Sequence, residues 1–288
     1  FGAFSFVQLE AVLQALTAKL DRIPSDEVDE IEDLIDCLVE ICESVTRDTV
    51  EEARKAIILI PTCLKLEKSV DPVVLTRLAA ALAEECSTFL VSSCHQDPVQ
   101  AFLGLLLRLT DQEGIVGVDD SSSPMTLNAW YLICEAVDCC DDDSNTLKIL
   151  ISLLGESLAP ILLKKATCPA PNLWANLQRD LQQQFLQIRR EFLDTLLYIQ
   201  RALRHLHSPS LLLELIHHDL LSSLTKSKIE TRLRALIIIS EEEEGEDGGG
   251  DGEFASSSWK KILSLVYSSP SITQDLVNAK LAISLFGS

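Results

Sequence analysis

The chain has 288 residues, of which 47% are hydrophobic and 24% are charged, and its formal net charge is −20. The apolar share is ample for a core, and the length fits two domains or one elongated domain. Direct nucleic-acid binding is disfavoured, because phosphate neutralisation needs an excess of Lys and Arg, whereas 44 acids face 24 bases here. An acidic surface suits basic partners, or serves solubility alone.

Cysteine usage and apolar runs indicate the compartment. Nine cysteines run from Cys37 to Cys168 on helix-like spacings, so most are expected to be small buried hydrophobes in a reducing compartment. The most apolar run, Leu147 to Leu163, is broken by charges and a proline, so we expect no membrane span and no membrane partner. The chain begins at Phe1, so we expect a segment of a longer cytosolic or nuclear protein.

Apolar residues recur every three or four positions along nearly the whole chain, which predicts one apolar stripe on each of a series of helices. No segment shows a convincing period of two, so the fold class is all-α. In chain order, the predicted helices span residues 6–20, 26–45, 49–68, 72–92, 98–111, 124–140, 145–167, 178–206, 210–224, 228–240, 257–267 and 272–286.

The ends of several helices are marked by their sequence. A capping side chain precedes a proline at Asp71-Pro72, Asp97-Pro98 and Ser123-Pro124, and proline at the first helical position loses only an N–H that has no partner there. Thr49 and Glu52 form a predicted capping box. Pro61 and Pro160 fall inside predicted helices, where we expect kinks.

The helices are expected to pair. The first four pairs begin near residues 6, 49, 97 and 145, a spacing close to that of HEAT and armadillo arrays. One such hairpin cannot bury its stripe alone, so neighbours stack. We therefore predict a right-handed α-α superhelix of the HEAT-repeat type, with residues 1–288 forming one elongated array of about six helix pairs. A four-helix bundle is the alternative, but about twelve helices are too many for it.

Charge is distributed unevenly along this array. Residues 21–52 contain 13 acids and two bases, whereas residues 162–234 contain 11 bases and six acids. Residues 241–253 carry eight acids and five glycines, a composition that cannot form a core. We therefore predict a flexible acidic loop over residues 241–257.

Candidate partner contacts lie in two acidic segments. The first is the elbow "GIVGVDDSSS", where Gly114 ends one helix and Ser123-Pro124 starts the next. The second is the acidic loop, which could neutralise a basic patch on a partner or simply be solvated. The predicted protein-binding residues are Asp119, Asp120, Glu241, Glu242, Glu243, Glu244, Glu246 and Asp247.

Other residues have a structural and a functional interpretation. Trp130 and Tyr131 could anchor an interface, but two adjacent aromatics on a helix are more often core. Arg190 precedes Asp194 by four residues, a spacing that predicts an intrahelical ion pair. A clamp formed by Arg189 and Arg190 on a cargo carboxylate is the alternative.

Catalytic and cofactor motifs are missing from the sequence. There is no nucleophile elbow, no P-loop and no dinucleotide fingerprint, and the acids of "GEDGGGDG" would repel a phosphate. Cys134, Cys139 and Cys140 lie beside Asp141 to Asp143, but no C-x-x-C pair supports a metal site. We therefore predict neither enzyme activity nor a metal or cofactor.

Two stretches resemble a known family. "DPVQAFLGLLLRLTDQEGIVGVDDSSSPMTLNAWYLICEAV" (residues 97–137) and "PILLKKATCPAPNLWANLQRDLQQQFLQIRREFLDTLLYIQRAL" (residues 160–203) are similar to the importin-thirteen and transportin-SR branch of the importin-β superfamily, the karyopherins. "ETRLRALIIISE" and "LVNAKLAISLFGS" follow in the family's order. The second stretch carries the resemblance through Gln184, Phe185, Arg189, Arg190, Asp194, Thr195, Leu196 and Tyr198. The insert at 241–253 departs from the family pattern.

This resemblance implies a nuclear transport receptor, of which the chain would be the central part. Such a receptor binds protein cargo, contacts nucleoporins and shuttles between cytoplasm and nucleus under control of the Ran GTPase. The main Ran-binding repeats of these receptors lie N-terminal to this segment, so the segment alone is expected to bind Ran poorly. Two alternatives stay open: an exportin of the same superfamily, and a static HEAT-repeat scaffold without a GTPase switch.

Overall fold

The computed structural model describes residues 6–20, 22–23, 28–43, 49–139, 144–221 and 226–243. Over this part of the chain the regular structure is helical, and β pairing is confined to one isolated bridge between Val116 and Asp120. The chain divides into two compact units, Phe1–Leu158 and Ala159–Ser288. This result agrees with the predicted all-α class.

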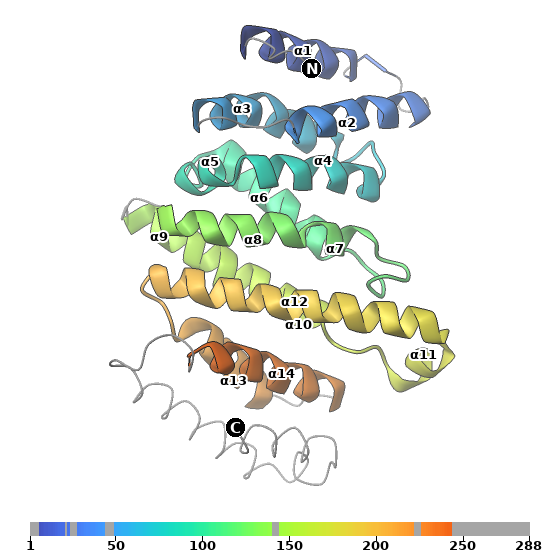
Figure 1. Ribbon diagram of the computed structural model, residues 1–288, viewed down its shortest axis with the longest axis vertical. Coiled ribbons are helices and arrows are strands. Elements are labelled where there is room, and N and C mark those ends of the chain that lie inside the picture. Colours follow the sequence, from blue (N-terminus) through green and yellow to red (C-terminus); the bar gives the residue numbers. More distant parts are fainter. Residues whose placement is uncertain are drawn as a thin grey trace. The chain divides into compact units, whose positions relative to one another are not determined.

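The first unit consists of helices packed as two rows (Figure 1). One row contains α1 (Phe6–Leu20), α3 (Thr49–Leu66) and α6 (Asp97–Thr110), each packed against the next. The other row contains α2 (Val28–Cys42), α4 (Pro72–Glu85) and α8 (Leu127–Ala136), again each packed against the next. Antiparallel partners such as α1 with α2 and α3 with α4 join the rows, which is the stacking of helical hairpins predicted from the sequence.

Helix α4 shows why these sequences stack. Asp71 accepts a hydrogen bond from the Val73 N–H at 2.8 Å and Pro72 follows it, so the helix begins where its capping pair predicts. Leu75, Leu78 and Leu82 are almost fully buried, and each contributes about 1.5–3 kcal/mol through burial. The small side chains of the alanines between these leucines let α2 and α8 pack closely against α4.

A buried lysine joins consecutive hairpins. Lys55 of α3 is 1% exposed, and its Nζ donates to the Cys42 carbonyl, the last residue of α2, at 3.1 Å. The final carbonyls of a helix lack partners within the helix and carry the negative end of its dipole. Lys55 therefore satisfies the end of α2 and ties it to the next hairpin.

One predicted helix, 72–92, is divided into two. Cys86, with φ −116° and ψ 22°, ends α4, and α5 (Ser87–Ser92) begins directly after it. The Glu52 carboxylate accepts a hydrogen bond from the Phe89 N–H at 3.1 Å, and the Cys86 thiol donates to the Glu52 carbonyl. Thus Glu52, predicted to complete a capping box with Thr49, serves a helix 37 residues away.

Pro61 and Pro160 have different effects. Helix α3 continues through Pro61. Near Pro160, by contrast, the helical segment Ser144–Lys165 changes register, with α9 (Ser144–Ile151) followed by a π-helical stretch (Ser152–Leu158) and then α10 (Ala159–Lys165). The missing N–H and the ring of a proline disturb the preceding turn, and a wider turn relieves that conflict.

Among the described residues, only this segment, Ser144–Lys165, is long and apolar enough to cross a membrane by length and composition. Its residues at four-residue spacing, Leu150, Leu154, Leu158 and Leu162, are fully buried inside the protein. The core of a stacked helical array requires an apolar stripe of this kind.

The remaining short elements of the first unit flank α8. They are α7 (Ser122–Met125), which lies between α6 and α8, and a 3-10 turn over Val137–Cys139. The last two residues of α7 and the whole 3-10 turn fall inside the predicted helix 124–140, which the structure therefore divides near both ends.

The second unit is built around the long helix α12 (Arg179–His205), which packs against α10 and α14 (Lys226–Glu243). Helix α13 (Leu211–Leu221) packs against α14 and α12. A short helix, α11 (Pro171–Asn176), was not predicted, and the ring of its Trp174 meets Phe185 edge to face with centroids 5.4 Å apart. Helix α14 continues through Glu243, three residues into the predicted loop, because Glu has a high helix propensity.

Candidate protein-binding surfaces

The glycine-containing elbow between α6 and α7 is a closed turn. Gly114 and Gly117 have φ of 118° and 75°, values that favour glycine, and the Ile115 carbonyl accepts the N–H groups of Asp119 and Asp120. Asp120 is 2% exposed, and its carboxylate accepts from the Ser123 N–H at 2.9 Å and the Ser123 hydroxyl at 2.5 Å. Asp120 therefore helps to start α7, while the neighbouring Asp119 is exposed.

The six other predicted binding residues lie at or beyond the end of α14. Glu241, Glu242 and Glu243 form the last three residues of this helix. Glu244, Glu246 and Asp247 lie outside the described residues, as do the rest of the predicted loop and the predicted helices 257–267 and 272–286. A role in partner binding stays a prediction for these residues and for Asp119 and Asp120.

Trp130 belongs to the core, as the more common interpretation of the Trp-Tyr pair predicts. It is fully buried, and its indole Nε1 donates to Thr110 Oγ1 at 2.8 Å. That hydroxyl lies 2.9 Å from Thr126 Oγ1, so the three polar groups satisfy one another between α6 and α8. Tyr131 is half-buried, and its hydroxyl bonds to the Glu135 carboxylate of the next turn.

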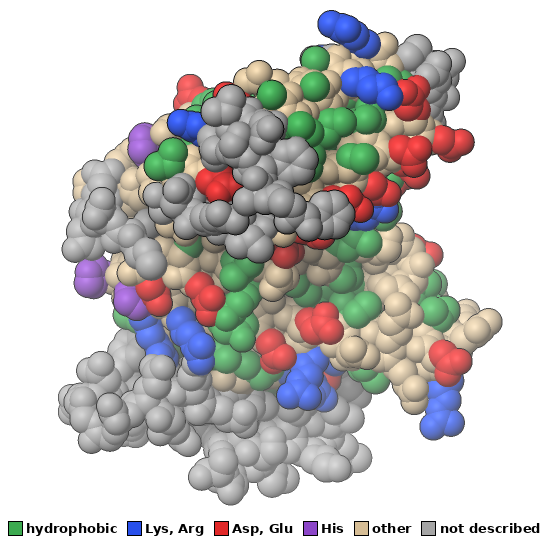
Figure 2. All heavy atoms as spheres, turned by 45° about the horizontal axis from the view of Figure 1, so that its top comes forward, with side chains coloured by type: hydrophobic (Ala, Val, Ile, Leu, Met, Phe, Trp, Pro, Cys, Tyr) green, Lys and Arg blue, Asp and Glu red, His purple; other side chains and the backbone are tan. Residues whose placement is uncertain are grey.

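A strongly acidic surface lies on the α2–α4 side of the first unit. Helix α2 contains six acids and no base, and Asp29, Asp33, Asp36 and Glu40 are exposed. Figure 2 shows Asp and Glu side chains gathered near the end of the molecule that carries α1 and α2. Ion pairs with Lys19 and Arg77 neutralise Glu30 and Asp36 only in part, because all four side chains stay well exposed.

Carboxylates continue this surface onto α4. Partial burial raises the pKa of Glu84, the amide of Asn128 opposes this at 2.7 Å, and the nearby Glu43 and Glu85 carboxylates raise it further. On α3, burial raises the pKa of Glu52, the hydrogen bond from the Phe89 N–H opposes this, and the Glu85 carboxylate raises it further. Mutual repulsion between carboxylates favours a basic partner, whose charges would relieve it.

In the second unit, Arg189 and Arg190 are neighbours in the chain but have different partners. Arg190 extends from α12 into solvent, and its Nε lies 3.7 Å from Asp194 Oδ2, which confirms the predicted intrahelical pair. Arg189 points the other way and is 5% exposed. Its guanidinium makes a fork with Glu230 of α14, at 3.3 and 3.1 Å.

Arg189 also joins the end of α10 to α14. Its Nε donates to the Ala166 carbonyl at 2.7 Å, and its Nη2 donates to Thr231 Oγ1 at 3.1 Å. Burial raises the pKa of Glu230, but bonds from Arg189 and Arg234 outweigh this and leave the pKa below its ordinary value. Sequence pattern could not predict this cluster, because the partners of Arg189 lie 23 to 42 residues from it in the chain.

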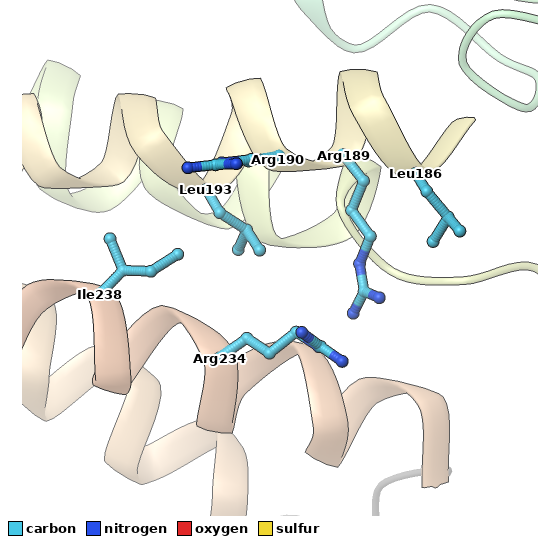
Figure 3. Close-up of a pocket in the computed structure, with 6 residues that line it drawn as sticks. All are labelled: Leu186, Arg189, Arg190, Leu193, Arg234 and Ile238. Atoms are coloured by element: carbon cyan, nitrogen blue, oxygen red, sulfur yellow. The ribbon is translucent and has the colours of Figure 1, made fainter. Parts of the chain in front are cut away.

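A groove of about 520 Å³ runs beside this cluster, between α12 and α14 (Figure 3). Leu186, Leu193 and Arg189 point into it from α12, and Arg234 and Ile238 face them from α14, with Arg190 at its edge. Leu186 is unusually exposed for a leucine, at 46%. The groove therefore combines apolar walls with guanidinium groups.

Cys42, Cys63, Cys86 and Cys134 of the first unit are buried side chains of the core. The described part of the chain contains no group of three or more His, Cys, Asp or Glu side chains placed to hold a metal. Burial raises the pKa of Cys42 to about 12 and raises those of Cys63, Cys86 and Cys134 as well. These protonated thiols behave as small hydrophobic side chains, as their spacing predicts.

Comparison with known proteins identifies the fold. The chain matches a solved structure described as "Importin13 cytosolic state" with a TM-score of 0.67 at 18% sequence identity. The match covers 93% of this chain and 33% of the other, so the chain spans about a third of the length of that protein. No protein-family model matches the sequence, and no curated protein matches it significantly. The chain has an importin-like, all-α HEAT-repeat fold.

Proposed function

We propose that this chain is a protein-binding segment of an importin-type nuclear transport receptor. The likeness to an importin over 93% of the chain is the observation that carries the proposal, and the family-like stretches at 97–137 and 160–203 support it. In the longer protein, Ran in its GTP form controls cargo binding, and the receptor shuttles between cytoplasm and nucleus in contact with nucleoporins. The segment binds proteins and catalyses no reaction.

The acidic α2–α4 surface suits a basic cargo segment. Exposed carboxylates such as Asp33 and Glu40 sit on one helix without a base among them, and Glu84 and Glu85 extend the charge to the next helix. Charge of one sign spread over neighbouring repeats speeds the approach of an oppositely charged chain and holds it by many weak contacts. Such binding weakens as salt is added.

The test uses the full-length protein with a bound basic cargo and purified Ran. Release of cargo by Ran-GTP, and not by Ran-GDP, is the expected result. Stronger cargo binding with Ran-GTP would identify an exportin, and indifference to Ran would identify a static scaffold, so either outcome overturns the importin assignment.

A charge reversal tests the surface separately. Asp33→Lys with Glu40→Lys is expected to weaken binding of the basic cargo, because both carboxylates are exposed on α2. Glu113→Lys with Glu191→Lys, two exposed acids on other elements, makes the same change in net charge and serves as the control. Equal weakening by both double variants would show that net charge, rather than this surface, attracts the cargo.

A further inference from the structure

The groove between α12 and α14 is lined by arginines and aliphatic side chains. Three arginines, Arg189, Arg190 and Arg234, are among its six lining residues, and the other three are Leu186, Leu193 and Ile238. No carboxylate is among these six, although acids outnumber bases by 20 over the whole sequence. Figure 3 shows the two leucines on the α12 side and Ile238 on the α14 side, with the arginines between and beside them.

The nearby carboxylates do not neutralise all of these positive charges. Glu230 is shared, because it receives the Arg189 fork and also the Arg234 Nε at 2.7 Å. Asp194 faces Arg190 at the longer distance of 3.7 Å. Among the described ion pairs of the groove, three guanidiniums therefore meet two carboxylates, an excess of one positive charge.

Two of these arginines are also accessible. The side chains of Arg190 and Arg234 are 83% and 46% exposed, whereas that of Arg189 is 6% exposed and is held by α10 and α14. Arginine offers five N–H donors in a planar fork, so a group that already contacts one carboxylate has donors left for another. Arg190 and Arg234 can thus bind an anion from solvent, while Arg189 links α12 to α14 beside the groove.

We propose that this groove docks an acidic, leucine-rich peptide segment of a partner protein. The partner's apolar side chains lie between Leu186, Leu193 and Ile238, and its carboxylates pair with Arg190 and Arg234. Charge complementarity selects this occupant, since a basic segment would be repelled by the guanidiniums and a purely apolar one would not use their remaining N–H donors.

Single-stranded nucleic acid is a poorer fit to the same charges. Proteins that bind it combine basic grooves with aromatic side chains on which the bases stack. None of the six lining residues is aromatic. A peptide offers the branched aliphatic side chains that these walls match.

The proposal concerns a second surface, distinct from the acidic α2–α4 surface, and does not depend on Ran. A scaffold would use this groove in the same way as a transport receptor. Failure of the peptide experiment therefore leaves the Ran-GTP release experiment unaffected, and the converse also holds.

The experiment measures fluorescence anisotropy of a labelled peptide, ELLEELLEELLE, titrated with the 288-residue chain. Saturable binding of this peptide to an acidic protein is the expected result, while versions with Lys for Glu, or Ser for Leu, bind at least about tenfold more weakly. Long-range charge favours the opposite order, because the chain repels acidic peptides and attracts basic ones. Preference for the acidic peptide would therefore report on a local site.

Point variants locate the site. Arg190→Glu and Arg234→Gln are each expected to weaken binding about tenfold, the usual effect of losing a hydrogen bond between charged groups. Leu186→Ser is expected to weaken it severalfold through lost apolar contact. Arg179→Glu changes an exposed arginine on the same helix outside the groove and should leave the affinity within about twofold.

Several results would overturn the proposal. Absence of saturable binding, equal binding of the Lys peptide, or equal weakening by Arg179→Glu and Arg190→Glu would each do so. Displacement of the peptide by a tighter-binding oligouridylate would assign the groove to nucleic acid instead. Circular dichroism of each variant confirms that the helices are intact, so lost binding cannot reflect unfolding.

Discussion

Replacing Arg189 with Met should loosen the second unit selectively. Four hydrogen bonds are lost, to Ala166, Thr231 and both oxygens of Glu230. Removing one partner of a buried ion pair costs about 3–5 kcal/mol. Glu230 keeps Arg234 and is 15% exposed, so we expect the lower end of that range, about 3 kcal/mol.

The neighbouring residue supplies a matched control. Arg190→Met makes the same change one position along α12, where the side chain is 83% exposed and its partner Asp194 lies 3.7 Å away. Exposed pairs of this kind contribute about 0–1 kcal/mol. Comparison of the two variants therefore separates burial and geometry from the loss of an arginine as such.

Hydrogen exchange read by mass spectrometry is the suitable assay, because the chain has two units and a single unfolding midpoint would mix them. A loss of about 3 kcal/mol speeds exchange roughly a hundredfold in peptides from α12 and α14. Peptides from α8 in the first unit should exchange as before. If Arg189→Met accelerates exchange no more than Arg190→Met does, the reasoning about this cluster is refuted.

Three further predictions concern single groups. The pKa of Glu230 is depressed in the folded protein. Its contribution to stability is therefore present above the unfolded pKa of about 4.3 and is lost as the pH falls through the lower folded value. Urea titrations between pH 6 and 3 should show this loss of stability, and Glu230→Gln should remove it. Gly114→Ala should destabilise the protein by about 1–3 kcal/mol, because φ at Gly114 is 118° and the new Cβ would lie 3.0 Å from Asp119 Cβ. Gly104→Ala, inside helix α6, should instead stabilise it by about 0.5–1 kcal/mol. Thermal unfolding compares the two variants, and equal effects would contradict the argument from φ. Iodoacetamide at pH 8 should modify the exposed Cys37 within minutes, and mass spectrometry should detect this. It should leave Cys42, Cys63, Cys86 and Cys134 unmodified until urea is added. Rapid labelling of any of these four cysteines in the native protein would show that its thiol is accessible.

Local pattern predicted the helices with good precision. The predicted starts near residues 6, 49 and 72 coincide with α1, α3 and α4, since an apolar period, a capping side chain and a proline are signals contained within a few residues. The predicted stacking of hairpins was confirmed in the same way, because an apolar stripe on every helix requires neighbours. The core position of Trp130 agrees with the expectation that adjacent aromatics on a helix are more often core.

Misplaced boundaries have a common cause. The break at Cys86 is held by Glu52, and the short helix α11 is held by contacts of Trp174 with Phe185 and of its carbonyl with Gln182, so neither depends on the residues that form it alone. Asp120 looked available for a partner, but its bonds to Ser123 turn it inward. Such outcomes depend on which side of a helix or loop meets another element.

The amino-acid sequence by itself determined that this protein is built of amphipathic helices, where several of them begin, and that the chain is acidic. Only the tertiary structure decided that Arg189 is a buried link while Arg190 faces solvent, and that a cationic groove lies between α12 and α14. The physical reason is that a helical period is written in neighbouring residues, whereas the partner of Arg189 lies 41 positions away and is reached only after the helices pack.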